Sequence, residues 1–184
     1  MRTTIGFAIL LCGAHCVAVA ASTPQSIRKS LPQPTVIQGF PCAKGYAWFF
    51  ADGQLEKCTV THEMPFGEAT IPAGSWITLT EDGKPRFVQM LHDAPILGLT
   101  CLGGSWLGPS EGPTVSFYPS GKLKQCFLTA DHTVHGVPCM KSGGIFGNRS
   151  VSGPMFYENG RLKSCTLTTD FGTQHRGELF KQAP

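Results

Sequence analysis

The chain of 184 residues has few charged side chains and no run of basic residues. Charged residues make up 15% of it, the formal net charge is +3, and no more than two Lys or Arg residues are adjacent. Proteins that bind nucleic acid usually carry a dense basic patch or stripe, so the composition argues against nucleic acid as a partner. A hydrophobic fraction of 41% also argues against a disordered chain.

Long hydrophobic runs are missing as well. No segment after the N-terminus approaches the roughly 20 apolar residues that a transmembrane helix needs. The N-terminus has the features of a secretory signal, with Arg2, an apolar stretch over residues 5–17 and Ala18-Val19-Ala20 as a cleavage site. We therefore predict a signal peptide over residues 1–20 and export to the periplasm or the extracellular space. Residues 21–35, rich in Ser, Pro and Gln, are expected to form a flexible lead-in.

Complete catalytic and metal-binding motifs are also missing. The segment His62-Glu63-Met64-Pro65-Phe66 lacks the second histidine of a zinc-protease helix, and Leu107 stands where the nucleophile-elbow motif over 103–107 needs glycine. No C-x-x-C pair occurs, which argues against a zinc site built from cysteines. We therefore expect a protein without catalytic residues, metal or cofactor.

Four short segments repeat along the chain, each with a glycine at the same place. The glycines are at 53, 83, 121 and 160, so the spacings are 30, 38 and 39 residues. Asp-Gly, Ser-Gly and Asn-Gly pairs between β-rich flanks favour two-residue hairpin turns. A repeat of this length predicts an array of hairpin modules. The segments are Phe49-Phe50-Ala51-Asp52-Gly53-Gln54-Leu55, Leu79-Thr80-Glu81-Asp82-Gly83-Lys84-Pro85, Phe117-Tyr118-Pro119-Ser120-Gly121-Lys122-Leu123 and Phe156-Tyr157-Glu158-Asn159-Gly160-Arg161-Leu162.

Counting outward from a two-residue turn assigns cross-strand partners and faces. It pairs Phe50 with Leu55, and likewise Tyr118 with Leu123 and Tyr157 with Leu162; such pairs contribute about 0.2–1 kcal/mol each. The tryptophans at 48, 76 and 106 are expected at a repeated packing position. The count places these residues on the core face: Phe49, Val60, Leu79, Met90, Phe117, Leu128, Phe156, Leu167 and the cysteines, with Arg86, Lys124 and Lys163 nearer the turn.

Six cysteines follow the same repeat. One cysteine lies five residues after the turn glycine in three modules, and each has a mate at the end of an upstream lead segment. In the second module both positions are apolar, Ile71 and Val88, as expected if the two positions are bonded to each other within a module. We predict the disulfides Cys42–Cys58, Cys101–Cys126 and Cys139–Cys165, each worth roughly 3 kcal/mol.

Polar residues recur after each hairpin. They form a candidate polar edge able to bind a metal or a cationic partner. The alternative is that these Asp and His side chains form turns by bonding to their own backbone. The residues are His62, Glu63, His92, Asp93, Asp131, His132 and Asp170.

The third and fourth segments resemble the repeat core of bacterial MORN-type variant proteins. That core has two aromatic residues, two turn residues, glycine, a basic residue, leucine and lysine, as in residues 117–124 and 156–163. The resemblance implies serial antiparallel hairpins in an elongated twisted sheet. It also implies a role in contacting partners or membrane surfaces, and it brings no catalytic residues.

Together these patterns predict an all-β protein of four disulfide-stapled hairpin modules over residues 36–184. The expected modules are 36–66, 67–93, 94–131 and 132–175. Because one hairpin is only marginally stable in water, the modules must stack. The expected function is non-enzymatic binding of a protein or envelope polymer, with contact to a membrane surface also considered.

Two alternatives use other parts of the sequence. A secreted hydrolase or effector would build its site from the His and Asp loops. An inhibitor or immunity-type protein would insert an exposed loop, over 103–113 or 142–153, into its partner. Asn148-Arg149-Ser150 also fits the N-glycosylation pattern.

Overall fold

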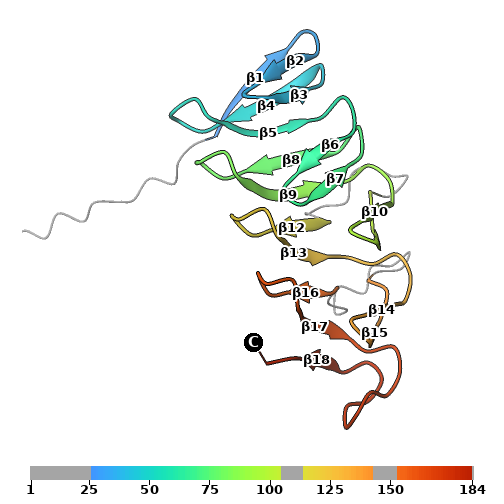
Figure 1. Ribbon diagram of the computed structural model, residues 1–184. Helices are drawn as coiled ribbons and strands as arrows, with labels where there is room; N and C mark the ends of the chain where they lie inside the picture. The colour runs from blue at the N-terminus through green and yellow to red at the C-terminus, as the bar shows by residue number, and fades with distance from the viewer. Residues whose placement is uncertain (1–25, 105–113, 143–152, 184) are drawn as a thin grey trace, which may run out of the picture.

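The computed structural model describes residues 26–104, 114–142 and 153–183. Every element in these ranges is a β-strand, and the strands stack into an elongated array (Figure 1). One large antiparallel sheet and a series of small hairpins make up the fold. The predictions of an all-β chain and of serial hairpin modules are confirmed.

The large sheet has ten strands in the order β1-β4-β5-β8-β9-β12-β13-β16-β17-β18. Consecutive neighbours pair antiparallel, so the sheet grows by one two-stranded hairpin per module. Its strands are β1 (Ile27–Leu31), β4 (Gly45–Phe49), β5 (Leu55–Thr59), β8 (Trp76–Leu79), β9 (Pro85–Gln89), β12 (Val115–Phe117), β13 (Leu123–Cys126), β16 (Met155–Phe156), β17 (Leu162–Thr166) and β18 (Leu179–Lys181).

Four small hairpins of three-residue strands form a second layer against one face of this sheet. We call this the inner face and the opposite one the outer face. One connected core of buried apolar residues fills the space between the layers. The small hairpins are β2 (Thr35–Ile37) with β3 (Phe40–Cys42), β6 (Met64–Phe66) with β7 (Ala69–Ile71), β10 (Ala94–Ile96) with β11 (Leu99–Cys101), and β14 (His132–Val134) with β15 (Val137–Cys139).

The turns of the large hairpins have three residues, so the expectation of two-residue turns is wrong. Phe50 C=O accepts from Gly53 N–H at 3.0 Å, and Phe50 N–H donates to Gln54 C=O at 2.9 Å. Only the glycine has a positive φ, +89° in this turn, whereas a two-residue type I′ turn needs a positive φ at both central residues. The turn is therefore a type I turn followed by a glycine bulge, and the Asp, Ser or Asn before the glycine does not need a positive φ.

The extra residue shifts the predicted pairs by one position. Leu55 lies opposite Phe49 rather than Phe50. Phe117 and Phe156 likewise replace Tyr118 and Tyr157 as partners of Leu123 and Leu162. The shift ends one residue later, because Lys124 has no cross-strand partner between Leu123, which faces Phe117, and Gln125, which faces Ser116. Arg86 and Lys163 hold the same unpaired position. Arg86, Lys124 and Lys163 are exposed and do not share the core face.

The predicted apolar core positions are buried. The core residues before the turns are at most 8% exposed, and those seven after the glycines at most 1%. On the inner face, one row of facing residues runs Cys58, Ile77, Val88, Val115 and Cys126. Trp48 and Trp76 do not belong to this core. They alternate along their strands with buried Ala47 and Ile77 and therefore lie on the outer face.

The lead segments are hairpins, which the sequence analysis missed. Type I′ turns occur at Gln38-Gly39, Leu97-Gly98 and His135-Gly136, where both residues have a positive φ. The expected boundary at 66/67 cuts the turn of the β6–β7 hairpin, whereas β10 and β14 begin at the boundaries expected for the third and fourth modules.

The expected flexible lead-in is wrong over residues 27–31. These residues form β1, whose five residues all pair with β4 at the edge of the sheet. An edge strand gains its stability from backbone hydrogen bonds and needs little hydrophobic patterning. The expected signal peptide lies outside the described residues.

Three disulfides join the layers, with the pairing that the repeat predicts. Cys42–Cys58, Cys101–Cys126 and Cys139–Cys165 have Cα–Cα distances of 5.7, 5.8 and 5.6 Å. Each links the last residue of a small hairpin to the second strand of a large hairpin. Ile71 and Val88 hold the same positions in the second module, and both are completely buried.

A side chain at a small-hairpin tip bonds to the backbone just after three of the large turns. Gln38 Oε1 accepts from Leu55 N–H at 2.8 Å, and His135 Nδ1 accepts from Leu162 N–H at 3.2 Å. Leu97 holds this tip position in the third module and has no acceptor atom in its side chain. There, Glu68 of the preceding small hairpin accepts from Leu123 N–H at 2.8 Å instead.

The hydrogen bond from Leu123 N–H to Glu68 connects the second and third modules directly. Pro85 stands where the other modules have leucine and has no N–H to donate, so the second module needs no tip acceptor. Glu68 N–H donates to Gly121 C=O at 2.9 Å. A Cβ atom on Gly67 would lie 2.3 Å from that same oxygen, so this contact requires glycine at 67.

Ile71 and Val88 hold the positions of the disulfide-bonded cysteines in the other modules, and substitution by cysteine tests this. The double variant Ile71→Cys with Val88→Cys should form a fourth disulfide, because the matching pairs have Cα atoms less than 6 Å apart. Closing a loop of this size should raise the free energy of unfolding by about 3 kcal/mol. Thiol titration and urea unfolding measure both effects. Each single variant should keep one free thiol, and two reactive thiols in the oxidised double variant would contradict the equivalence.

The hydrogen bond from Leu162 N–H to His135 predicts that glutamine at position 135 preserves the stability that alanine loses. His135→Ala should lower the free energy of unfolding by about 1 kcal/mol, because Leu162 N–H loses its acceptor. His135→Gln should retain most of the stability, since Gln38 makes the same bond in the first module. Urea unfolding of the two variants provides the comparison, and equal losses would show that the hydrogen bond does not contribute.

Candidate functional site

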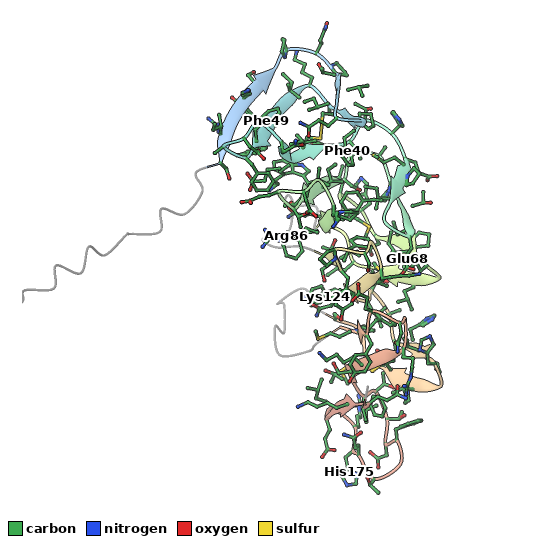
Figure 2. The ribbon with its side chains drawn as sticks, turned by 60° about the vertical axis from the view of Figure 1, so that its left-hand side comes forward. Phe40, Phe49, Glu68, Arg86, Lys124 and His175 are labelled. Carbon is green, nitrogen blue, oxygen red and sulfur yellow. A yellow bond between two sulfur atoms is a disulfide. The ribbon has the colours of Figure 1, made fainter. Side chains whose placement is uncertain are left out.

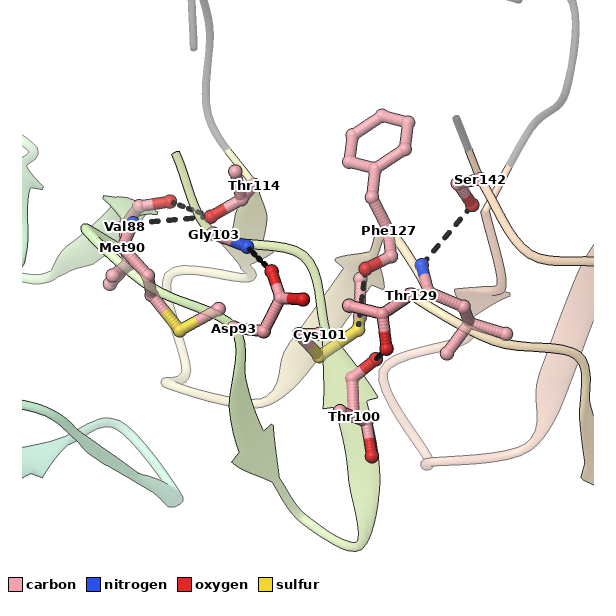
Figure 3. The surroundings of a disulfide bond; sticks show 12 residues. Val88, Met90, Asp93, Thr100, Cys101, Gly103, Thr114, Phe127, Thr129 and Ser142 are labelled. Carbon is pink, nitrogen blue, oxygen red and sulfur yellow. Dashed lines mark hydrogen bonds between the residues drawn. A yellow bond between two sulfur atoms is a disulfide. The ribbon is translucent and has the colours of Figure 1, made fainter. Parts of the chain in front are cut away.

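The residues of the predicted polar edge lie at the entrances of the small hairpins or just after β17. All are exposed. Three of the carboxylates accept backbone N–H groups: Asp93 from Gly103 at 2.7 Å, Asp131 from Lys141 at 2.8 Å and Asp170 from Arg176 at 2.9 Å. Figure 3 shows the first of these bonds beside Cys101. These bonds reach backbone groups six or ten residues along the chain, so they are not the local turn contacts of the alternative interpretation.

The other members of the polar edge are spread along the array. His62 Nδ1 lies 3.0 Å from Thr61 Oγ1, and Glu63 immediately precedes β6. His92 precedes β10, more than one module before His132. Within the described ranges, no group of three or more His, Cys, Asp or Glu side chains is arranged to hold a metal ion.

A cavity of about 270 Å³ lies between the tips of successive hairpins. His132, His135 and Glu68 contribute its ionisable side chains, and Leu99, Val134 and Phe156 are among its apolar ones. Two of the polar groups are already engaged: His135 Nδ1 with Leu162 N–H, and Glu68 with Leu123 N–H and Lys122 Nζ, the latter at 2.8 Å. Two of the three ionisable side chains that line the cavity therefore already accept backbone N–H groups of the fold.

Opposing effects set the protonation of Glu68. Partial burial raises the pKa of the carboxyl group, but the hydrogen bond from Leu123 N–H and the Lys122 ammonium outweigh it and lower the pKa overall. Glu68 lies on the small-hairpin side of the molecule, away from Arg86 (Figure 2).

The outer face carries one row of facing residues across all ten strands. Its first half is aromatic, cationic and partly exposed, while Ser116 and Ser164 in the second half are 8% and 6% exposed. In strand order the row is Arg28, Trp48, Lys57, Thr78, Phe87, Ser116, Gln125, Met155, Ser164 and Lys181.

Aromatic rings and cations alternate over β1, β4, β5, β8 and β9. We call this set the aromatic–cation strip. Lys57 Nζ lies 4.4 Å from the ring centroid of Trp76 and 5.5 Å from that of Trp48, and the two indole centroids are 5.5 Å apart. The strip consists of Arg28, Tyr46, Trp48, Lys57, Trp76, Arg86 and Phe87.

Guanidinium groups stand over the rings at both ends of the strip. Arg28 Cζ lies 4.4 Å from the ring centroid of Tyr46, and Arg86 Cζ lies 4.8 Å from that of Phe87. Tyr46 is 51% exposed. Cations over aromatic faces are stabilised by the ring quadrupole, by about 0.5–1 kcal/mol where exposed. The strip is therefore an ordered surface with charges that remain accessible.

Lys57 sits in the centre of the strip. Burial lowers the pKa of its ammonium group, and the nearby Glu56 carboxylate raises it in part. Glu56 also belongs to a hollow of about 650 Å³ near the large turns, together with Glu81, Asp82 and Arg86. Its Oε2 atom is buried without a hydrogen-bond partner in the described part of the chain.

The sequence analysis singled out Trp48 and Trp76 for a structural reason only and did not identify the strip. The signal was present as Tyr46-Ala47-Trp48, in which two large aromatic residues flank a small one with a period of two. The third tryptophan, Trp106, the candidate loops over 105–113 and 143–152, and Asn148 lie outside the described residues.

No family model matches the chain, and no curated protein or solved structure matches it either. Among the described residues, no helix is long and apolar enough to cross a membrane.

Proposed function

We propose that the chain is an exported, non-enzymatic repeat protein that binds a protein or polymer partner through the aromatic–cation strip. The observation that carries the proposal is the group of Tyr, Trp, Arg and Lys side chains on the outer face of β1 to β9. Clustered exposed aromatic residues often mark interaction sites, and Trp, Tyr and Arg contribute most to binding energy in interfaces.

Export and the MORN-type relationship are part of the proposal. The three disulfides support an oxidising compartment, either the periplasm or the extracellular space. The predicted signal peptide over residues 1–20 agrees with this location. The serial hairpins are the architecture that a MORN-type repeat implies, and proteins built from such arrays commonly bind through an extended surface.

A binding role also agrees with the uses of the polar residues. Asp93, Asp131 and Asp170 satisfy backbone N–H groups at the hairpin entrances. A hydrolase needs a nucleophile, a base and a group that orients the base within hydrogen-bond reach of one another. The aromatic–cation strip instead offers the chemistry of recognition.

Affinity capture with the disulfide-intact chain tests the proposal. The chain should retain a defined component from the envelope or medium of its own organism. The double variant Tyr46→Ser with Lys57→Gln should retain at least about tenfold less of it, since two contacts of about 1 kcal/mol each are lost.

Leu97→Ser provides the matched control. Leu97 is 51% exposed, as Tyr46 is, but lies at a small-hairpin tip in the other layer. The control should retain the component as the unchanged chain does. Equal retention by the strip variant would contradict binding through the outer face, and so would the absence of any retained component.

A further inference from the structure

We infer that the partner of the aromatic–cation strip is a polysaccharide that carries carboxylate groups. This inference rests on the proposed function and names the class of its ligand. Three properties of the strip support it: the extended row of residues across the strands, its composition, and its accessible cations.

The shape of the strip suits a chain that lies across the strands. The facing residues Trp48, Lys57, Thr78 and Phe87 come from four adjacent strands. With neighbouring strands about 4.8 Å apart, these four positions span about 14 Å. A polymer of sugar rings can follow such a row ring by ring without a deep pocket, and polar Thr78 lies within it.

The composition of the strip suits sugar rings better than a protein surface. On the outer face of β4, β5, β8 and β9 the side chains are aromatic, Lys, Arg, Thr or Gln, and none is aliphatic. The core of a protein interface is depleted of lysine, whereas Lys57 stands at the centre here. The negative face of an indole or phenol ring attracts the C–H groups of a pyranose ring.

The cations provide the selectivity for an acidic polymer. Arg28, Lys57 and Arg86 have no ion-pair partner in the part of the chain that the structure describes. Glu56 lies beside Lys57, and Arg86 shares its hollow with Glu56, Glu81 and Asp82, so a bound carboxylate is expected at Lys57 and Arg28 rather than at Arg86. An incoming carboxylate would form charge-assisted hydrogen bonds with Lys57 and Arg28.

The density of charge favours carboxylated over heavily sulfated polymers. Sites for highly sulfated polysaccharides such as heparin are typically runs of five to eight Lys and Arg residues. In this chain at most two basic residues are adjacent. Three cations interleaved with four aromatic rings fit a polymer with one charge per one or two sugar units.

Binding to polymers of known structure tests the inference. The disulfide-intact chain is titrated with polygalacturonate, alginate and hyaluronate by calorimetry and tryptophan fluorescence. At least one should bind and change the emission, because Trp48 and Trp76 lie in the strip. Methyl-esterified polygalacturonate keeps the sugar rings and loses the charges; if polygalacturonate binds, its ester should bind at least about tenfold more weakly. Added salt should weaken binding to the acidic polymer.

A pair of lysine variants locates the site. Lys57→Gln should weaken binding to the acidic polymer by at least about tenfold, as expected for the loss of a hydrogen bond to a charged group. Lys124→Gln removes another exposed ammonium that lies over a ring, 5.7 Å from the centroid of Tyr118, but outside the strip. Its affinity should be unchanged. Circular dichroism and the absence of free thiols establish that both variants are folded.

Three outcomes would overturn the inference: no binding to any of the three acidic polymers, equal binding of polygalacturonate and its methyl ester, and equal effects of the two lysine variants. Binding to heparin alone would also overturn it. If these polymers fail while affinity capture still depends on Tyr46 and Lys57, only the ligand class is wrong. If both experiments fail, the proposed function is wrong as well.

Discussion

Every repeat depends on one buried contact between the end of a small hairpin and the second strand of a large one. The contact is a disulfide in three modules and the apolar pair of Ile71 and Val88 in the other. Neither hairpin can bury its apolar face alone, because a two-stranded unit is only marginally stable in water. Joining the layers at this point commits the inner face of the sheet to the core and leaves the outer face free for another use.

The second constraint comes from the glycine bulge at each large turn. The residue three positions after the glycine has no cross-strand partner, as at Lys124 and Lys163, and the tip of a small hairpin bonds to the backbone N–H just before it, at Leu55 and Leu162. Where Leu97 cannot accept this bond, Glu68 of the preceding module does so. The second and third repeats are therefore coupled directly through Glu68 and through the close approach of Gly67 to Gly121.

Periodicity and cysteine spacing were sufficient to predict the all-β class, the buried apolar positions and the three disulfides. They failed where the outcome depended on a single residue. A two-residue and a three-residue turn both place Asp-Gly at the tip, and they differ in the φ of the residue before Gly53 and in the hydrogen bonds of Phe50. The strand β1 has little apolar patterning and is stabilised by pairing with β4. The strip escaped prediction because Trp48 and Lys57 become neighbours only once the register is known.

The disulfides join cysteines that are consecutive within the described part of the chain, 16, 25 and 26 residues apart. A chain that is exported as proposed, with its N-terminus first, exposes each cysteine together with its partner before the next pair appears. Oxidation in order of emergence then gives the native pairing directly, and slow disulfide reshuffling is not required. The modular topology thus allows the order in which the cysteines emerge to direct correct pairing.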